Sequence, residues 1–278
     1  MSAGVFALVM LAALLHALWN ALVKTAADRT AVLGLISLGH VILGLSMAFF
    51  VPFPAVASWP FILGSTVIHF GYYYLLNRSY RLGDLSHVYP IARGITPVLV
   101  TLGAQAAAGE VLPVQAWAGV FAVSAGIILL SALSWRRATG AGALAAALMT
   151  GGTIAAYSLV DGLGVRASGA PLGYIAWLFI MEIFVTAFIF LHRGRLMLQL
   201  PRRVLGSGVA GGLTSASAYG LVIWAKMLAP LGIVSSLRET SVLFAALIGV
   251  VALGERPWRG RLAAACVVVT GVGLIAFS

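Results

Sequence analysis

The stretch "PIARGITPVLVTLGAQAAAGE" (90–110) decides the fold, because "SSLRETSVLFAALIGVVALGE" (235–255) repeats its pattern 145 positions later. One offset without a gap pairs Arg93 with Arg238, Thr96 with Ser241, Gly109 with Gly254, Glu110 with Glu255, Tyr74 with Tyr219, and Gly126 with Gly271. Chance explains one or two such matches, but not all of them at a single offset. The sequence therefore predicts two related halves, 1–136 and 137–278.

Composition places both halves in a membrane. The chain has 278 residues, of which 62% are hydrophobic and 9% charged, whereas a soluble domain carries about 25% charged residues. We predict an all-α polytopic membrane protein with no soluble domain. The net charge of +10 does not gather into one basic face, so we expect no nucleic-acid partner. The single Cys266 excludes an internal disulfide.

A membrane-spanning helix needs about 20 apolar residues, and cuts at proline, glycine and charge clusters give ten such segments. The expected spans are 4–24, 31–51, 59–79, 86–107, 113–133, 142–164, 172–191, 204–226, 231–252 and 258–277. Each half thus holds five helices. Because five is odd, the second half must enter from the opposite side, which makes the halves an inverted repeat, as in many secondary transporters.

Basic residues set the orientation. Arg93 and Arg238 lie inside spans, which leaves fifteen of the seventeen Lys and Arg residues near span ends. The expected topology puts only Arg166 and Lys226 on one side. The other side receives Lys24, Arg29, Arg78, Arg81, Arg136, Arg137, Arg193, Arg195, Arg202, Arg203, Arg256, Arg259 and Arg261. Since the positive side is cytoplasmic, we expect an integral inner (plasma) membrane protein with both termini outside.

The Gly109-Glu110 and Gly254-Glu255 pairs, each followed by a last helix of small residues, carry a family resemblance. The chain resembles the drug/metabolite transporter superfamily in its ten-helix form, built of two EamA-type halves. The stretches "HALWN" (16–20) and "YRLGDLSHVYPIARGITP" (80–97) are similar to a branch associated with phosphonate-utilisation gene clusters. The resemblance implies a secondary transporter or exporter of small metabolites with a central cavity shared by the halves, and it leaves the substrate open.

Two arginines inside the membrane need an explanation. Arg93 and Arg238 each lie seven residues into a span, on opposite sides of the midplane, and an arginine at a helix centre costs about 2.5–3.5 kcal/mol on insertion scales. In one interpretation they bind an anionic group of the substrate. In the other, Arg238 is neutralised by a carboxylate such as Glu182, and Arg93 bonds carbonyls freed near Pro90 and Pro97. Those prolines also predict a kinked helix, which lines a cavity or is an ordinary transmembrane kink.

Further polar residues share faces of the first and third spans, and they line a cavity or hydrogen-bond between helices. The predicted substrate-binding residues are Arg93, Arg238, His16, Asn20, Trp19, His69, Tyr73, Asn77, Tyr89 and Tyr219. Glu182 and Glu239 are candidates for proton coupling, with a fixed ion pair as the alternative.

The polar residues are expected near the midplane, and this favours a transporter that moves a small anionic or zwitterionic metabolite by alternating access. The alternatives are a membrane-embedded enzyme or flippase-like lipid carrier, for which a site near the lipid headgroups would be needed, and a scaffold without a ligand. The sequence has no Walker loop and no H-x-x-x-H or H-E-x-x-H spacing. We therefore expect no enzyme activity, no cofactor and no metal, and only a small-molecule substrate and membrane lipid as partners.

Overall fold

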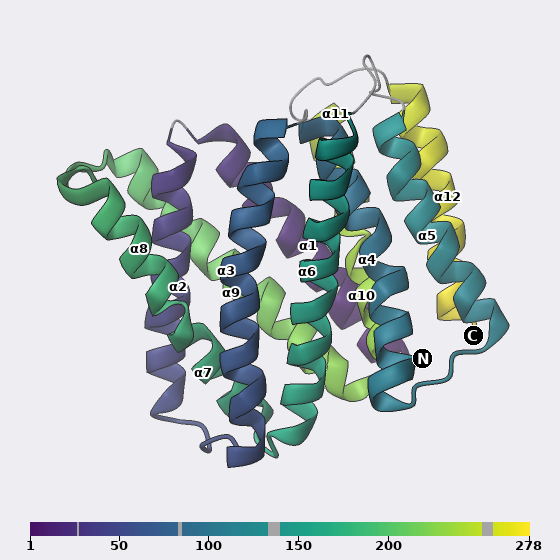
Figure 1. The fold of residues 1–278 in the computed structure, drawn as a ribbon, viewed down its shortest axis with the longest axis horizontal. Helices are drawn as coiled ribbons and strands as arrows, with labels where there is room; N and C mark the ends of the chain where they lie inside the picture. The colour runs from purple at the N-terminus through teal and green to yellow at the C-terminus, as the bar shows by residue number, and fades with distance from the viewer. Residues whose placement is uncertain (27, 83–84, 133–139, 252–257) are drawn as a thin grey trace.

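The computed structural model describes residues 1–26, 28–82, 85–132, 140–251 and 258–278, and these are almost entirely helical (Figure 1). Two short 3₁₀ helices, Val56–Ser58 and Gly194–Gln199, lie in connections. The α-helices are α1 (Ala3–Thr25), α2 (Arg29–Ala48), α3 (Trp59–Leu82), α4 (Leu85–Ala108), α5 (Val114–Ala132), α6 (Ala141–Ala167), α7 (Pro171–Met181), α8 (Ile183–Arg193), α9 (Arg202–Leu228), α10 (Leu231–Arg238), α11 (Ser241–Val251) and α12 (Trp258–Ala276).

These helices correspond to the ten expected spans, with α7–α8 and α10–α11 each forming one interrupted span. Within the described residues, seven helical stretches are long and apolar enough to cross a membrane, and two shorter apolar stretches lie in α5 and α12. The expected all-α fold is thereby confirmed for the described residues, and several of its helices are long and apolar enough to span a membrane.

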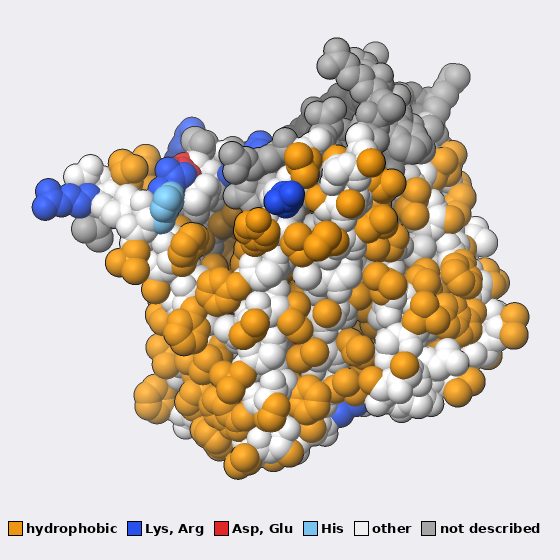
Figure 2. Space-filling model, viewed as in Figure 1, with side chains coloured by type: hydrophobic (Ala, Val, Ile, Leu, Met, Phe, Trp, Pro, Cys, Tyr) orange, Lys and Arg blue, Asp and Glu red, His pale blue; other side chains and the backbone are white. Residues whose placement is uncertain are grey.

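The surface of the helices supports this placement. Orange apolar side chains are spread over the visible face below the basic residues of the upper edge (Figure 2). Large hydrophobic residues are well exposed on several helices, for example Val67 at 70%, Phe121 at 54% and Leu213 at 60%. Contiguous apolar surface of this kind is costly in water, and in a bilayer it faces lipid tails.

Helix packing pairs distant parts of the chain. Helix α5 packs on α12, α3 on α6, α1 on α9, and α2 on α7. Glycines allow α5 and α12 to approach closely. A Cβ on Gly126 would meet Val268 and the carbonyl oxygen of Ala264, and a Cβ on Gly271 would meet Val123 and the carbonyl oxygen of Gly119. The two sets are equivalent at the offset of 145, because Gly126 corresponds to Gly271, Val123 to Val268 and Gly119 to Ala264.

The two ends of the bundle differ in charge. Both termini lie at the lower end in Figure 1, where the α2–α3, α4–α5, α6–α7 and α9–α10 connections also lie. The basic side chains visible in Figure 2 gather mostly at the upper edge. The helix ends there carry Arg29, Arg78, Arg193, Arg195, Arg202 and Arg203. The lower ends of α6 and α9 carry Arg166 and Lys226.

The interrupted spans do not break at proline. Helix α4 continues through both Pro90 and Pro97. The break between α7 and α8 falls at Glu182, and that between α10 and α11 at Glu239 and Thr240. At the second break the Glu239, Thr240 and Val242 amides each donate to the carbonyl three residues earlier, a tighter turn than the α-helix. The sequence analysis did not anticipate either break.

Candidate functional site

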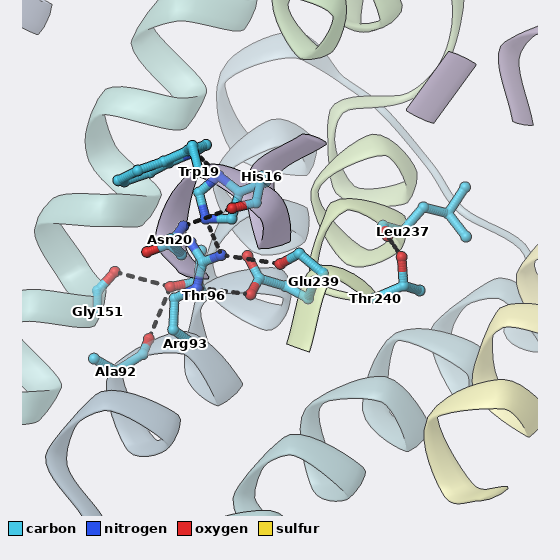
Figure 3. Close-up of polar contacts among 11 residues, drawn as sticks. His16, Trp19, Asn20, Ala92, Arg93, Thr96, Gly151, Leu237, Glu239 and Thr240 are labelled. Carbon is cyan, nitrogen blue, oxygen red and sulfur yellow. Dashed lines mark hydrogen bonds and ion pairs between the residues drawn. The ribbon is translucent and has the colours of Figure 1, made fainter. Parts of the chain in front are cut away.

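Arg93 is the centre of a buried polar cluster in the middle of α4 (Figure 3). Its Nε lies 3.0 Å from Oε2 of Glu239. One terminal nitrogen lies 3.2 Å from Nε2 of His16 and 3.4 Å from the hydroxyl of Ser241. Arg93 is 4% exposed and Glu239 1%. We call these four residues the Arg93 cluster; they join α1, α4 and the α10–α11 break.

Glu239 reaches Arg93 because of the break. It follows α10 as its C-terminal cap, next to Arg238 in sequence, but its carboxylate pairs with the arginine of the other half. The Nε hydrogen is not aligned on Oε2, since neither atom has a hydrogen bond of good geometry. The contact is therefore an ion pair between two buried charges, and each would be strongly disfavoured without the other.

His16 faces two donors at once. Trp19 Nε1 lies 3.3 Å from its Nδ1, and Arg93 lies 3.2 Å from its Nε2. A neutral imidazole offers one acceptor nitrogen, so only one of these contacts is a hydrogen bond at any time. Asn20 donates its amide to the His16 backbone carbonyl at 2.7 Å. The predicted face of the first span is thus turned to Arg93 through His16.

Arg238 is buried but has no anionic partner. It is 7% exposed at the end of α10, and its guanidinium carbon lies over the ring of Tyr219, 5.7 Å from the centroid. Across the described part of the chain, Arg238 makes no hydrogen bond and no ion pair, whereas Arg93 makes both kinds of contact.

The hydroxyl group of Tyr219 is held by a buried carboxylate. Its hydroxyl donates to Oδ2 of Asp161, and the Tyr174 hydroxyl lies 3.4 Å from Oδ1 of the same carboxylate. Asp161 and Tyr174 are both fully buried. The Tyr219 ring beneath Arg238 is thus tied to α6 through Asp161, and the same carboxylate also contacts Tyr174 of α7.

A small cleft with several aromatic side chains around it lies beside Tyr219. His69 stacks on Tyr157 at 4.2 Å between ring centroids and meets Tyr219 edge-on at 6.3 Å. The cleft is lined by Thr66, His69, Leu178, Phe179, Met181, Glu182, Val185 and Tyr219. His69, Tyr219 and Glu182, which the sequence singled out on three different spans, therefore lie around one space.

Glu182 does not pair with Arg238. Its carboxylate accepts a hydrogen bond from Ser37 at 2.9 Å, and its other oxygen lies 3.7 Å from Nδ1 of His40. The hypothesis that Glu182 neutralises Arg238 is therefore wrong. The hypothesis that Arg93 bonds carbonyls freed near the prolines is wrong too, because its contacts are to Glu239, His16 and Ser241.

The other predicted residues lie at differing distances from the arginines. Tyr89 is beside Arg93, whose guanidinium carbon is 5.7 Å from its ring centroid. Tyr73 is 39% exposed on α3, in ring contact with Tyr72. The side chain of Asn77 lies outside the described residues. Thr96 bonds Ala92 and Gly151 carbonyls and not an arginine, while its counterpart Ser241 does contact Arg93.

Sequence reasoning missed a second polar group near the lower end. Lys226, expected at a membrane surface, is fully buried, and its ammonium donates to the backbone and hydroxyl oxygens of Ser158 at 2.7 and 2.9 Å. Glu110 pairs with Arg166 at 2.6 Å and accepts from the Leu231 amide at 2.8 Å. Lys226 follows Tyr219 by two helical turns, and this spacing was the available signal that both share a buried face.

Comparison with known proteins shows the fold alone. No family model matches the chain, and no curated protein matches it. A solved structure titled only "Crystal structure of protein" superposes with a TM-score of 0.80 over 99% of both chains, at 17% sequence identity. Such a likeness over the whole length means that the complete helical arrangement recurs in a solved protein.

Proposed function

We propose that this chain is a secondary transporter of the drug/metabolite transporter superfamily, in the ten-helix EamA form. It moves a small anionic or zwitterionic metabolite across the inner membrane by alternating access. The observation that carries the proposal is Arg238, a buried arginine in the middle of the bundle that the described protein groups leave without an anion. A protein keeps such a group in a membrane where it faces a ligand or water.

The contacts between helices support the inverted-repeat part of the proposal. A two-fold relation between halves requires every contact to recur with its partners exchanged. The reciprocal contacts of Gly126 and Gly271 meet this requirement. So does the contact of Ser37 with Glu182, which are themselves 145 positions apart and hence meet at the axis. The α1–α9 and α3–α6 packings form another exchanged pair.

The orientation part rests on charge. Apart from Arg166, the described arginines outside the core gather at the end of the bundle opposite the two termini. By the positive-inside rule that end is cytoplasmic, and both termini are outside. The arginine of the substrate site then lies between two halves that can rock around it, as alternating access requires.

Ligand binding to purified protein tests the proposal. Anionic metabolites with carboxylate, phosphate or phosphonate groups are screened for a rise in melting temperature, and ligands that raise it are tested for counterflow in proteoliposomes. Losing one hydrogen bond to a charged group removes about 1.5–3 kcal/mol, so Arg238→Gln should weaken binding by about 10- to 100-fold. Arg203→Gln, which changes an exposed arginine at the start of α9, is the matched control.

The result that contradicts the proposal is equally specific. A ligand that binds Arg238→Gln and wild type with equal affinity does not use this arginine. If no ligand that binds also shows counterflow, the chain is a binding protein and the transporter proposal is contradicted.

A further inference from the structure

His40 of α2 is a buried polar side chain that the proposed substrate site does not use. It is 6% exposed, and neither of its ring nitrogens has a hydrogen-bond partner within the described residues. Its ring lies against Phe179 of α7, with 4.9 Å between the ring centroids. Leaving a buried polar group without a partner is costly, so an imidazole in this state needs a specific explanation.

His40 faces the carboxylate of Glu182 at the α7–α8 break. Its Nδ1 lies 3.7 Å from Oε1 of Glu182, a separation that fits an ion pair but is too long for a hydrogen bond. Ser37 donates to the other carboxylate oxygen, Oε2, at 2.9 Å. No Lys or Arg of the described chain pairs with Glu182. His40 and Oε1 therefore face each other, and both have unused hydrogen-bonding capacity.

The surroundings of the pair supply no fixed positive charge to Glu182. The other titratable and charged groups on the helices around it are His16 of α1, which contacts Arg93, His69 and Tyr73 of α3, Tyr219 of α9, which lies under Arg238, and Arg193 of α8, which pairs with Asp28. With a neutral imidazole, the pair of His40 and Glu182 carries a net charge of −1 inside the bundle. A buried charge of this kind is strongly disfavoured without a balancing one.

We propose that His40 and Glu182 form a proton-binding site. The neutral ring of His40 takes up one proton from solvent, so that both ring nitrogens carry a hydrogen and the Nδ1 hydrogen points to Oε1. The net charge of the pair changes from −1 to zero, and no bond other than the new N–H bond forms or breaks. The proton reaches the site from the cleft, because the Glu182 side chain is 19% exposed and lines that cleft.

The site joins the two halves of the chain. His40 belongs to the first half and Glu182 to the second, and at the offset of 145 His40 corresponds to Val185, so the second half has no equivalent histidine. If the proposed transport function holds, the halves move relative to each other and the separation of His40 and Glu182 changes with that movement. The proton is then the coupling ion for a substrate anion at Arg238. Proton binding itself does not depend on that function.

NMR of the purified protein in detergent, with nitrogen-15 in its histidine rings, tests the site between about pH 5 and about pH 9. The His40 signal is the one that is missing from His40→Gln. In wild type it should change between the charged and the neutral pattern within this range. In Glu182→Gln its midpoint should move by about one pH unit or more, a tenfold change in proton affinity. His192, which is exposed at the end of α8, is the control and should keep its midpoint.

Two results overturn the site. One is a wild-type His40 signal that keeps a single pattern over the whole range, and the other is a midpoint that is the same in wild type and Glu182→Gln. If Glu182→Gln does not accumulate, the melting temperatures of wild type and His40→Gln over the same range give a second test. A group that binds a proton in the folded state contributes to the pH dependence of stability, so the two curves should differ in shape. His192→Gln, the matched control, should follow wild type, and parallel curves for wild type and His40→Gln overturn the site. No measurement uses a ligand, so the result is independent of the substrate proposal.

Discussion

Helix α4 and the interrupted span α10–α11 carry matched arginines 145 positions apart, but they differ in backbone and in charge pairing. Helix α4 contains Pro90 and Pro97 and is continuous. The α10–α11 span has Ser235 and Val242 at those positions, yet it breaks after Arg238. Proline thus fails to interrupt one copy, and the proline-free copy is interrupted.

The difference in charge pairing between Arg93 and Arg238 follows from the position of the Glu239 carboxylate. The break carries Glu239 away from its neighbour Arg238 and toward Arg93, 3.0 Å away. Glu239 pairs with Arg93, and Arg238 is left with only the Tyr219 ring. We infer that Arg93 clamps α4 to α10–α11, while Arg238 is the arginine open to a ligand. The idea that Arg93 binds substrate stays a prediction, and a substrate anion would have to compete with Glu239 for this arginine.

The largest expected effect comes from breaking the clamp. Arg93→Gln leaves Glu239 buried without its cation, and removing one partner of a buried pair costs about 3–5 kcal/mol. Arg238→Gln removes no ion pair and should change stability far less. Unfolding of purified variants in detergent measures both. Arg93→Gln combined with Glu239→Gln should recover part of the loss, because no unpaired charge remains.

Equal destabilisation by Arg93→Gln and Arg238→Gln would break the comparison, since it would mean that the two arginines have equivalent roles. A double variant no more stable than Arg93→Gln would show that packing, and not the ion pair, holds the two spans together.

Much of the fold was accessible from sequence because apolar length and charge position are local properties. The ten expected spans match the observed helices within a few residues, and Gly109, with φ of 66°, ends α4 where the Gly109-Glu110 pair predicted an end. Arg93 and His16 were chosen for polarity at membrane depth, and the structure places them in contact.

The pairing of charges was not accessible in the same way. Helical geometry correctly indicated that Glu239 points away from Arg238, but its partner depends on how α10–α11 crosses α4. No proline or glycine near Glu182 indicated the break there. Lys226 looked like a surface charge because only the packing of α6 reveals the Ser158 oxygens that bind it. These are tertiary features that override local signals.

A medium effect is expected at the start of α10, which positions Arg238. Glu110 accepts from the Leu231 amide and pairs with Arg166, so Glu110→Ala removes a helix cap and an ion pair. Caps contribute about 0.5–2 kcal/mol, and the partly exposed pair adds little. We expect a loss of about 1–2 kcal/mol, with Glu110→Gln milder because it keeps an acceptor. Unchanged stability of Glu110→Ala would show that α10 is held by its packing on neighbouring helices, chiefly α4 and α1.

The smallest effect is expected at the prolines themselves. Pro97 lacks an amide hydrogen, and Pro97→Ala supplies one to the carbonyl four residues earlier, that of Arg93. Helix α4 is already continuous, so the new bond should alter neither its path nor the position of Arg93. We expect a stability change below about 1 kcal/mol and unchanged ligand affinity. The measurements are unfolding in detergent and the melting-temperature shift with whichever ligand the screen identifies. A large loss of affinity in Pro97→Ala with normal stability would mean that the proline shapes the site after all. The difference between α4 and α10–α11 would then be due to the backbone as much as to charge pairing.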